Sequence, residues 1–542
     1  MTRLACALAL VLVTSPAFAQ LEDVGSIHFP TSTTSAEAQG HFLRGVAILY
    51  SFGWKQAIAE FQAAQKLDPG FAMAYWGETL CYNHPLQGEQ NVKDPRAVLA
   101  RLGATREARL AKAPTAREKG LVDAVETLWG DGDWRDRRVA YMDAMAALHR
   151  EYPDDDEIAT FYAIATLSGA RALDDNSFRY EMRAGAIGLD VFKRNDRHPG
   201  AVHVVIHAFD DPIHAPLALE AARVYAEIVP AVSHAIHMPT HIFIQHGMWT
   251  EVSEQNMRAF QVGKDLWEPG DTPGDMAHSL DWGQYGWLQR GNYAKARENI
   301  ETFEWMLETT KQPRARGALN LVRARYIIET EEWKVDDLPD DASNETILAH
   351  GISAARTGNR AAAERAAAML AAKLKAGASP AATPADPHAS HAPAPPPPAA
   401  GEMTEGEKSV FVMHREVAAL VHLMKGEQDE AVAMLREAVR VEESMRPPNG
   451  AASPIKPSHE LLGEVLLELD RPAEAAAAFE TSLMRMPGRA RSLLGSARAH
   501  AAAGDRTIAA ARFATLRDNW AGHRDLPGYQ EADRYLTTTM AR

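Results

Sequence analysis

The sequence predicts an all-α protein that contains internal repeats. Alanine and leucine are abundant, and aromatic residues make up 7% of the 542 residues, a composition that favours helices over sheets. A pattern of Gly, Ala, Phe and Pro recurs with constant spacing in distant parts of the chain. Glycine also precedes alanine-containing segments at several positions, as expected where one helix ends and the next begins. We therefore expect helices arranged in repeating units.

The repeat pattern is clearest near the C-terminus and reappears near the N-terminus. At offsets of 0, 12, 16 and 24 residues, the C-terminal copy contains Gly463, Ala475, Phe479 and Pro487. The same offsets in the N-terminal copy give Gly45, Ala57, Phe61 and Pro69. Ala509 and Phe513 follow Ala475 and Phe479 by 34 residues. Turn segments that begin with Gly291, Gly358 and Gly426 support the pattern, because each lies four or five residues before an alanine.

This spacing resembles the tetratricopeptide repeat, and the resemblance covers most of the chain. It implies an α-solenoid of stacked antiparallel helix pairs, with a small residue where two helices cross, an aromatic residue on the second helix and a terminating proline. The chain resembles secreted bacterial tetratricopeptide-repeat proteins. That resemblance implies the fold and no particular reaction, since repeat scaffolds host many functions.

One segment is predicted to be a linker. Residues 376–402 consist almost entirely of Ala, Pro, Gly, Ser, Thr, Asp and His, so they have few side chains to bury. We expect a flexible, disordered Ala/Pro-rich linker over 376–404. It separates an N-terminal helical array at 20–375 from a C-terminal array at 405–542, and the sequence leaves open whether the two arrays dock.

The first residues predict export. Arg3 and the short apolar run Leu4–Val13 precede Ala17-Phe18-Ala19, a small-x-small cleavage pattern, so we expect a signal peptide at 1–19. The mature chain would then be periplasmic or secreted and would keep Cys81 as its one cysteine, which excludes an internal disulfide.

Charge and hydropathy exclude two classes of partner. Loss of Arg3 with the signal peptide would change the formal net charge from −15 to −16, which argues against nucleic acid and anionic lipid. The run in the signal peptide is too short to span a membrane, and no later stretch reaches the roughly 18 apolar residues that a span needs. We expect no nucleic-acid partner and no membrane span. A protein or peptide in the concave groove of the solenoid is the partner that the fold suggests.

Histidines are concentrated in the middle of the chain. Residues 198–246 contain eight of the 21 histidines, whereas a window of this length should contain about two. Two HxxxH pairs occur there, His203/His207 and His237/His241. Residues four apart share one face of a helix, so both imidazoles of such a pair can bind one metal ion. His234 ranks below these four, because Pro239 predicts a helix start or kink between it and His241.

The repeat register extends this group to a third unit. In three consecutive units the first helix carries His203 with His207, His237 with His241, and His278 with Asp281. In tetratricopeptide arrays, most of these positions line the concave groove, as the resemblance implies. Neighbouring helices lie about 8–10 Å apart, a gap that facing imidazoles can bridge. Asp210 is a further candidate, either as a ligand or as a group that orients a ligand.

The predicted site is a transition-metal site. Its six candidate ligands are His203, His207, His237, His241, His278 and Asp281. Imidazole with carboxylate suits Cu, Zn, Fe or Mn, and the ligand number permits a dinuclear site. We therefore expect an exported scaffold with a metal site in its groove. The alternatives are a metal-dependent enzyme, hydrolytic or oxidative, with Asp210 as acid or base, and a metal-free interaction scaffold whose histidines form a polar seam.

Overall fold

The computed structural model describes residues 19–86, 91–173, 175, 177–376, 403–445 and 448–540. A short antiparallel hairpin of β1 (Ala19–Leu21) and β2 (Gly25–Ile27) comes first, and helices follow. The predicted signal peptide lies outside the described residues except for Ala19. The predicted linker also lies outside them, apart from its first residue and its last two.

The helices of the first half carry four of the six predicted ligands, namely His203, His207, His237 and His241. They are α1 (Ala36–Tyr50), α2 (Trp54–Leu67), α3 (Ala72–Leu80), α4 (Lys93–Leu102), α5 (Arg106–Leu110), α6 (Ala116–Leu128), α7 (Trp134–Glu151), α8 (Asp156–Ala172), α9 (Arg179–Arg194), α10 (Pro199–Ala208), the 3₁₀ helix η1 (Ala215–Ala218), α11 (Leu219–Ile228), α12 (Ser233–His237) and α13 (Pro239–Gln245).

The helices of the second half complete the stack. They are α14 (Trp249–Leu266), α15 (Gly274–Gln289), α16 (Tyr293–Thr310), α17 (Pro313–Thr330), α18 (Asn344–Arg356), α19 (Arg360–Lys375), α20 (Glu405–Lys425), α21 (Gln428–Glu443), α22 (Ser458–Glu468), α23 (Pro472–Arg485), α24 (Ala490–Ala503), α25 (Arg506–Asn519) and α26 (Pro527–Met540).

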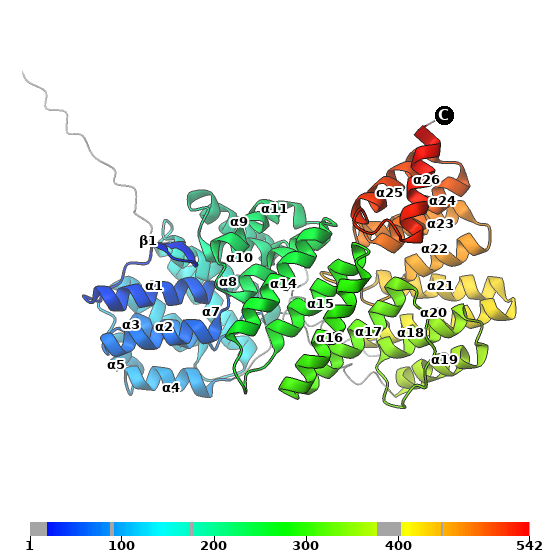
Figure 1. Ribbon diagram of the computed structural model, residues 1–542. Helices are drawn as coiled ribbons and strands as arrows, with labels where there is room; N and C mark the ends of the chain where they lie inside the picture. Colours follow the sequence, from blue (N-terminus) through cyan, green and yellow to red (C-terminus); the bar gives the residue numbers. More distant parts are fainter. Residues whose placement is uncertain are drawn as a thin grey trace, which may run out of the picture.

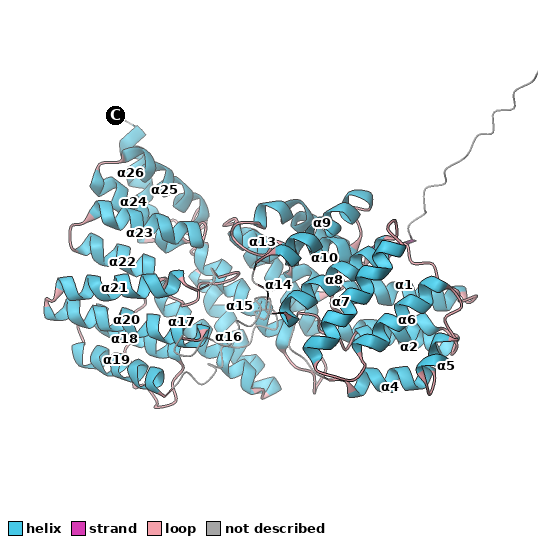
Figure 2. Cartoon of the chain, turned by 180° about the vertical axis from the view of Figure 1, so that it is seen from behind, coloured by secondary structure: helices cyan, strands magenta, loops and turns pink. Residues whose placement is uncertain are grey.

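The helices form an α-solenoid. Consecutive helices such as α1 and α2, α18 and α19, or α22 and α23 pack side by side, joined by short turns that make them antiparallel. Helices two apart also pack together, as α1 does with α3 and α22 with α24, so each pair stacks on the next. Figure 1 shows this succession from the N-terminal to the C-terminal end, and Figure 2 shows it from behind. The all-α, tetratricopeptide-repeat-like prediction is confirmed.

The repeated Gly and Phe positions meet in the packing of successive pairs. The ring of Phe61 lies against Gly45 of its own pair and against Gly77 of the next pair. Phe479 lies in the same way against Gly463 and Gly495. In both places the two glycines are 32 residues apart. A buried aromatic ring therefore fills the space that two missing side chains leave, which explains why the pattern recurs.

This packing predicts opposite effects for two substitutions in α1. Gly45→Ala should destabilise the protein by about 1–3 kcal/mol, because the new Cβ would lie 2.8 Å from Cε1 of the buried Phe61. Gly40→Ala should stabilise it by roughly 0.5–1 kcal/mol, because Gly40 is an exposed helical residue with nothing within 4 Å of the new atom. Urea unfolding of both variants measures the difference. Equal effects would contradict the proposed role of Gly45.

The stack continues across the predicted linker. Helix α20 packs against both α18 and α19, and one apolar core joins residues of α17, α18 and α19 to residues of α20 to α24. A larger core covers the first half of the chain and also includes Ala452, between α21 and α22, and Met486, directly after α23. The chain before the linker and the chain after it are therefore docked. Among the described residues, no helix has the length and apolar character needed to cross a membrane.

Candidate metal centre

Helices α10, α12, α13 and α15 bring the histidines together. Helix α10 carries His203 and His207, and α15 carries His278. The predicted break at Pro239 is present, since α12 ends at His237 and α13 begins at Pro239. Helix α10 contacts α13, and α12 contacts α15, so side chains from separate repeats reach the same place.

Three imidazoles, here named the first triad, converge through their Nε2 atoms. His237 Nε2 lies 3.0 Å from His241 Nε2 and 2.8 Å from His278 Nε2. One ligand nitrogen from each of the three lies within 4.8 Å of the others, close enough for one metal ion to contact all three. All three side chains are buried, with at most 4% of each residue exposed.

A hydrogen bond that Asn256 accepts determines which nitrogen of His237 carries the proton. The Asn256 amide donates to the Val252 carbonyl at 2.8 Å and to Thr240 Oγ1 at 3.1 Å, so its Oδ1 atom faces His237. His237 Nδ1 lies 2.6 Å from that oxygen, which can only accept. Nδ1 of His237 is therefore the protonated nitrogen, and in the neutral ring Nε2 presents a lone pair to the triad.

Asp210 acts in the same way on His241. Its carboxylate oxygen Oδ2 lies 2.7 Å from His241 Nδ1 and accepts a hydrogen bond from it, so His241 Nε2 also presents a lone pair. The two Nε2 atoms that lie 3.0 Å apart are then both acceptors when the rings are neutral. Two lone pairs at this distance repel each other unless a cation lies between them, and orienting groups of this kind are typical partners of metal-bound histidines.

Burial disfavours a proton as the cation between the two Nε2 atoms. It lowers the pKa of His237 well below the ordinary value, and the neighbouring His278 and His241 lower it further. His237 is therefore neutral at physiological pH, which is the form that binds metal. The indole of Trp282 lies against all three rings, with centroids 4.4–5.4 Å away, and closes one side of the triad.

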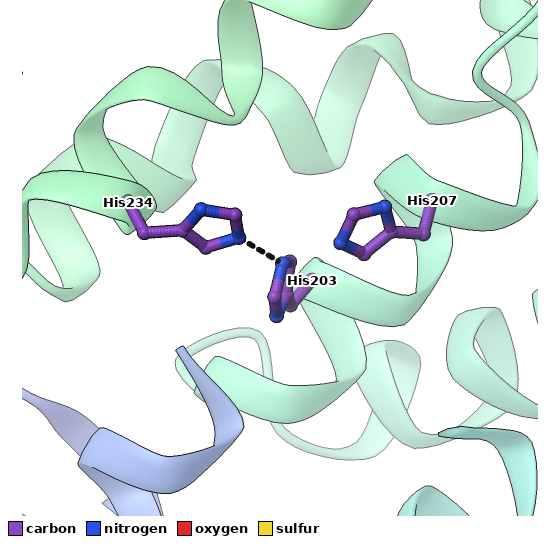
Figure 3. Close-up of side chains that lie close together, drawn as sticks. All are labelled: His203, His207 and His234. Carbon is purple, nitrogen blue, oxygen red and sulfur yellow. Dashed lines mark hydrogen bonds between the residues drawn. The ribbon is translucent and has the colours of Figure 1, made fainter. Parts of the chain in front are cut away.

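A second triad consists of His203, His207 and His234 (Figure 3), and its member His234 shares the short helix α12 with His237 of the first triad. Its ligand nitrogens also lie within 4.8 Å of one another, and the His203 and His234 Nε2 atoms are 3.0 Å apart. Burial lowers the pKa of His203 to about 3, although the Tyr50 carbonyl that its Nδ1 contacts opposes this shift. Burial and neighbouring imidazoles also lower the pKa values of His207 and His234. All three rings are neutral at physiological pH.

Five of the six predicted ligands belong to the two triads, and Asp281 does not. The Asp281 carboxylate pairs instead with the Arg325 guanidinium, with 2.6 Å between Oδ1 and Nη1. Asp210 contacts His241 Nδ1, as expected for a group that orients a ligand, which was one of its three predicted roles. The sequence prediction left out His234, whose distance from His203 depends on how α12 packs. It also missed Asn256, which no sequence motif marks.

Five of the six triad histidines are buried and His207 is half-buried, so they do not line an open groove, and part of the C-terminal half covers the site. The Asn449 amide donates to Asp210 Oδ2 at 3.3 Å. Gly450 lies so close to Trp282 that a Cβ at this position would be 2.6 Å from Cζ2 of the indole. Residues from distant parts of the sequence therefore complete the wall of the site. The spacing of the repeats does not predict these residues.

No protein-family model matches the chain, and no curated protein matches it. Solved structures similar to it include the human IFIT1 dimer with m7Gppp-AAAA, at 13% identity over 90% of this chain and 91% of that one, with a TM-score of 0.33. The P58(IPK) TPR domain is 13% identical over 94% of this chain and 100% of that one, with a TM-score of 0.21. Yeast Tom70 is 11% identical over 94% and 89%, with a TM-score of 0.28. Likenesses of this size contain no information on ligand, partner or reaction.

Proposed function

We propose that this helical repeat protein is exported and binds a transition-metal ion at the first triad. The observation that carries the proposal is the pair of His237 and His241, whose Nδ1 protons are held by Asn256 and Asp210 while their Nε2 atoms meet 3.0 Å apart. The lone pairs of these two Nε2 atoms repel each other when both rings are neutral. A metal ion between the two atoms is coordinated by both lone pairs, which removes the repulsion. Export rests on the sequence pattern of residues 1–19.

The ligand set narrows the choice of metal. Both triads consist of imidazoles, without a thiolate or a carboxylate among their members. Imidazole suits Zn, Cu and Fe, whereas Mn prefers carboxylate and carbonyl oxygens. Since Asp281 is paired with Arg325, the structural support for Mn is weaker than for the other three metals.

A metal-dependent enzyme is the second candidate function, because each triad offers three protein ligands. Three ligands leave a coordination position for water or another small molecule, as in catalytic zinc sites, whereas structural sites have four protein ligands. Asp210 is the nearby carboxylate that could accept a proton: its Oδ1 atom is buried and has no hydrogen-bond partner among the described residues. Whether the reaction would be hydrolytic or oxidative depends on the metal.

Elemental analysis of the exported protein tests the proposal. Protein isolated without added metal should contain a transition metal in stoichiometric amount, and His237→Ala/His241→Ala should lose the metal of the first triad.

Asp210→Asn should keep the fold and bind the same metal about 10–100-fold more weakly, because His241 loses its anionic partner. Removing the metal with a chelator should lower the free energy of unfolding, by about 2.7 kcal/mol relative to free metal at 100 times its dissociation constant.

The control keeps the number of lost histidines the same. His214→Ala/His246→Ala removes two histidines of the same region, which contact Asp211 and the Ile242 carbonyl and belong to neither triad. This variant should keep the full metal content. Equal trace metal in wild type and in His237→Ala/His241→Ala would exclude the proposed site and would favour the metal-free interaction scaffold.

A further inference from the structure

We propose that the second triad is also a metal site and that the two triads form one dinuclear centre. The proposal rests on the proposed function and extends it from one metal ion to two. His203, His207 and His234 point toward one another from two helices, as Figure 3 shows. Three observations carry the proposal: the orientation of His203, the backbone at Phe52 and the chain connections between the triads.

The first observation is the orientation of His203. Its Nδ1 atom lies 2.5 Å from the Tyr50 carbonyl oxygen, which can only accept, so Nδ1 carries the proton. The lone pair of Nε2 then points toward the rest of the second triad, where His234 Nε2 lies 3.0 Å away. His203 is thus held as a metal ligand by a main-chain acceptor, a common partner of metal-bound histidine.

The second observation is Phe52, in the turn between α1 and α2. Its φ angle is 56°, in the left-handed region, where a bulky side chain is strained. The turns that end α15, α18, α20 and α24 contain glycine in this conformation, namely Gly291, Gly358, Gly426 and Gly504, and the turn that ends α22 contains the smaller polar residue Asp470. The ring at Phe52 lies against all three imidazoles of the second triad, with centroids 4.5–5.7 Å away. The strained residue thus supplies an apolar wall to this triad, and strain of this kind is typical of functional sites.

The third observation is the close connection between the triads. His234 and His237 belong to the single short helix α12, and each contributes to a different triad. His207 lies in the last turn of α10, and Asp210, three residues later, orients His241 of the first triad. One helix and one hydrogen bond therefore fix the two triads relative to each other. The six imidazoles of the two triads, five of them buried, provide three ligands for each of two ions.

Copper(II) titration of the full-length metal-free protein tests the proposal. After removal of unbound copper, wild type should retain two equivalents, and His203→Ala/His234→Ala should retain one. His237→Ala/His278→Ala should also retain one. Two adjacent copper(II) ions couple magnetically, so the wild-type EPR signal should be much smaller than two isolated ions would give. Each one-site variant should show the full signal of one ion.

The outcomes separate the two proposals. One equivalent in wild type that is unchanged in His203→Ala/His234→Ala would exclude the second site and leave the first intact. Two equivalents with two additive EPR signals would exclude the dinuclear centre. No bound copper in wild type would exclude the proposed function as well. Circular dichroism checks the fold of each variant, and His203→Gln/His234→Gln, which retains polar side chains of similar size, replaces the alanine variant if that variant does not fold. His214→Ala/His246→Ala should retain both equivalents.

Discussion

Replacing Arg489 by methionine is expected to destabilise the protein by about 3–5 kcal/mol, because it breaks a buried ion pair from one side. Arg489 precedes α24 and is fully buried. Its guanidinium makes two hydrogen bonds to Glu460, at 2.7 and 3.0 Å, and one to Glu329 at 2.5 Å. The substitution leaves both carboxylates buried without this partner. Urea-induced unfolding measures the loss.

The reason for the large effect is that Arg489 connects three separate helices. Glu460 belongs to α22 and Glu329 to α17, and the Tyr285 hydroxyl of α15 lies 3.2 Å from the same guanidinium. Burial alone would raise the pKa of Glu460, but Arg489 and Lys456 outweigh burial and lower it below its ordinary value. The Arg489 side chain therefore holds the C-terminal helices against the middle of the solenoid.

A matched substitution separates this effect from the loss of any arginine. Arg498→Met removes a partner of Glu531 in α26, but the two side chains are 48% and 31% exposed. Such a pair contributes less than about 1 kcal/mol, so this variant should remain close to wild type. Adding Glu460→Gln to Arg489→Met should recover part of the lost stability. Similar unfolding of Arg489→Met and Arg498→Met would contradict the assigned role.

The repeats could be predicted from the sequence because their spacing reflects a local contact. Gly45 and Phe61 lie in consecutive helices, so their separation in sequence is fixed by the length of one helix and one turn. The contact of the same ring with Gly77 belongs to the next unit and was found only in the structure. The burial of Arg489 could not be predicted either, since a charged residue at a helix boundary is typical of a surface.

The candidate site could be predicted where ligands are one helical turn apart. His203 and His207 are four residues apart in α10, and residues with this spacing lie on the same face of a helix, so the sequence alone predicts the pair. Repeat register added His278, but it also selected Asp281, whose carboxylate turns to Arg325. Asn256 lies in α14, outside both HxxxH motifs, and its contact with His237 arises only from the packing of α12 on α14. The residues that orient the ligands are brought to them by tertiary packing, and the spacing of residues in the sequence does not predict such contacts.

Replacing Glu416 by glutamine is expected to stabilise the protein, by an amount that grows with pH. Glu416 lies in α20 and is fully buried, and neither carboxyl oxygen has a hydrogen-bond partner among the described residues. Burial raises its pKa well above 4.5, and the negative charges of Glu442 and Glu460 add to this, whereas Lys456 and Ser458 oppose it. The folded state therefore holds the proton of Glu416 more tightly than the unfolded state does.

The direction of the pH dependence follows from proton binding. Above the unfolded pKa the folded state binds more protons, so raising the pH lowers the free energy of unfolding of wild type, by at most about 1.4 kcal/mol per pH unit for one carboxyl group. The loss stops once the pH exceeds the folded pKa. Glu416→Gln lacks this ionisation, so its advantage should be small near pH 4.5 and should reach about 1–3 kcal/mol at pH 8.

Unfolding curves at several pH values test this prediction against a variant with the same change in charge. Glu430→Gln alters an exposed carboxylate of α21 and should stay within about 0.5 kcal/mol of wild type at every pH. A Glu416→Gln advantage that is constant between pH 4.5 and 8 would mean that Glu416 keeps the same pKa in both states. The buried carboxyl group would then be stabilised by a partner, and its proton would not be linked to folding.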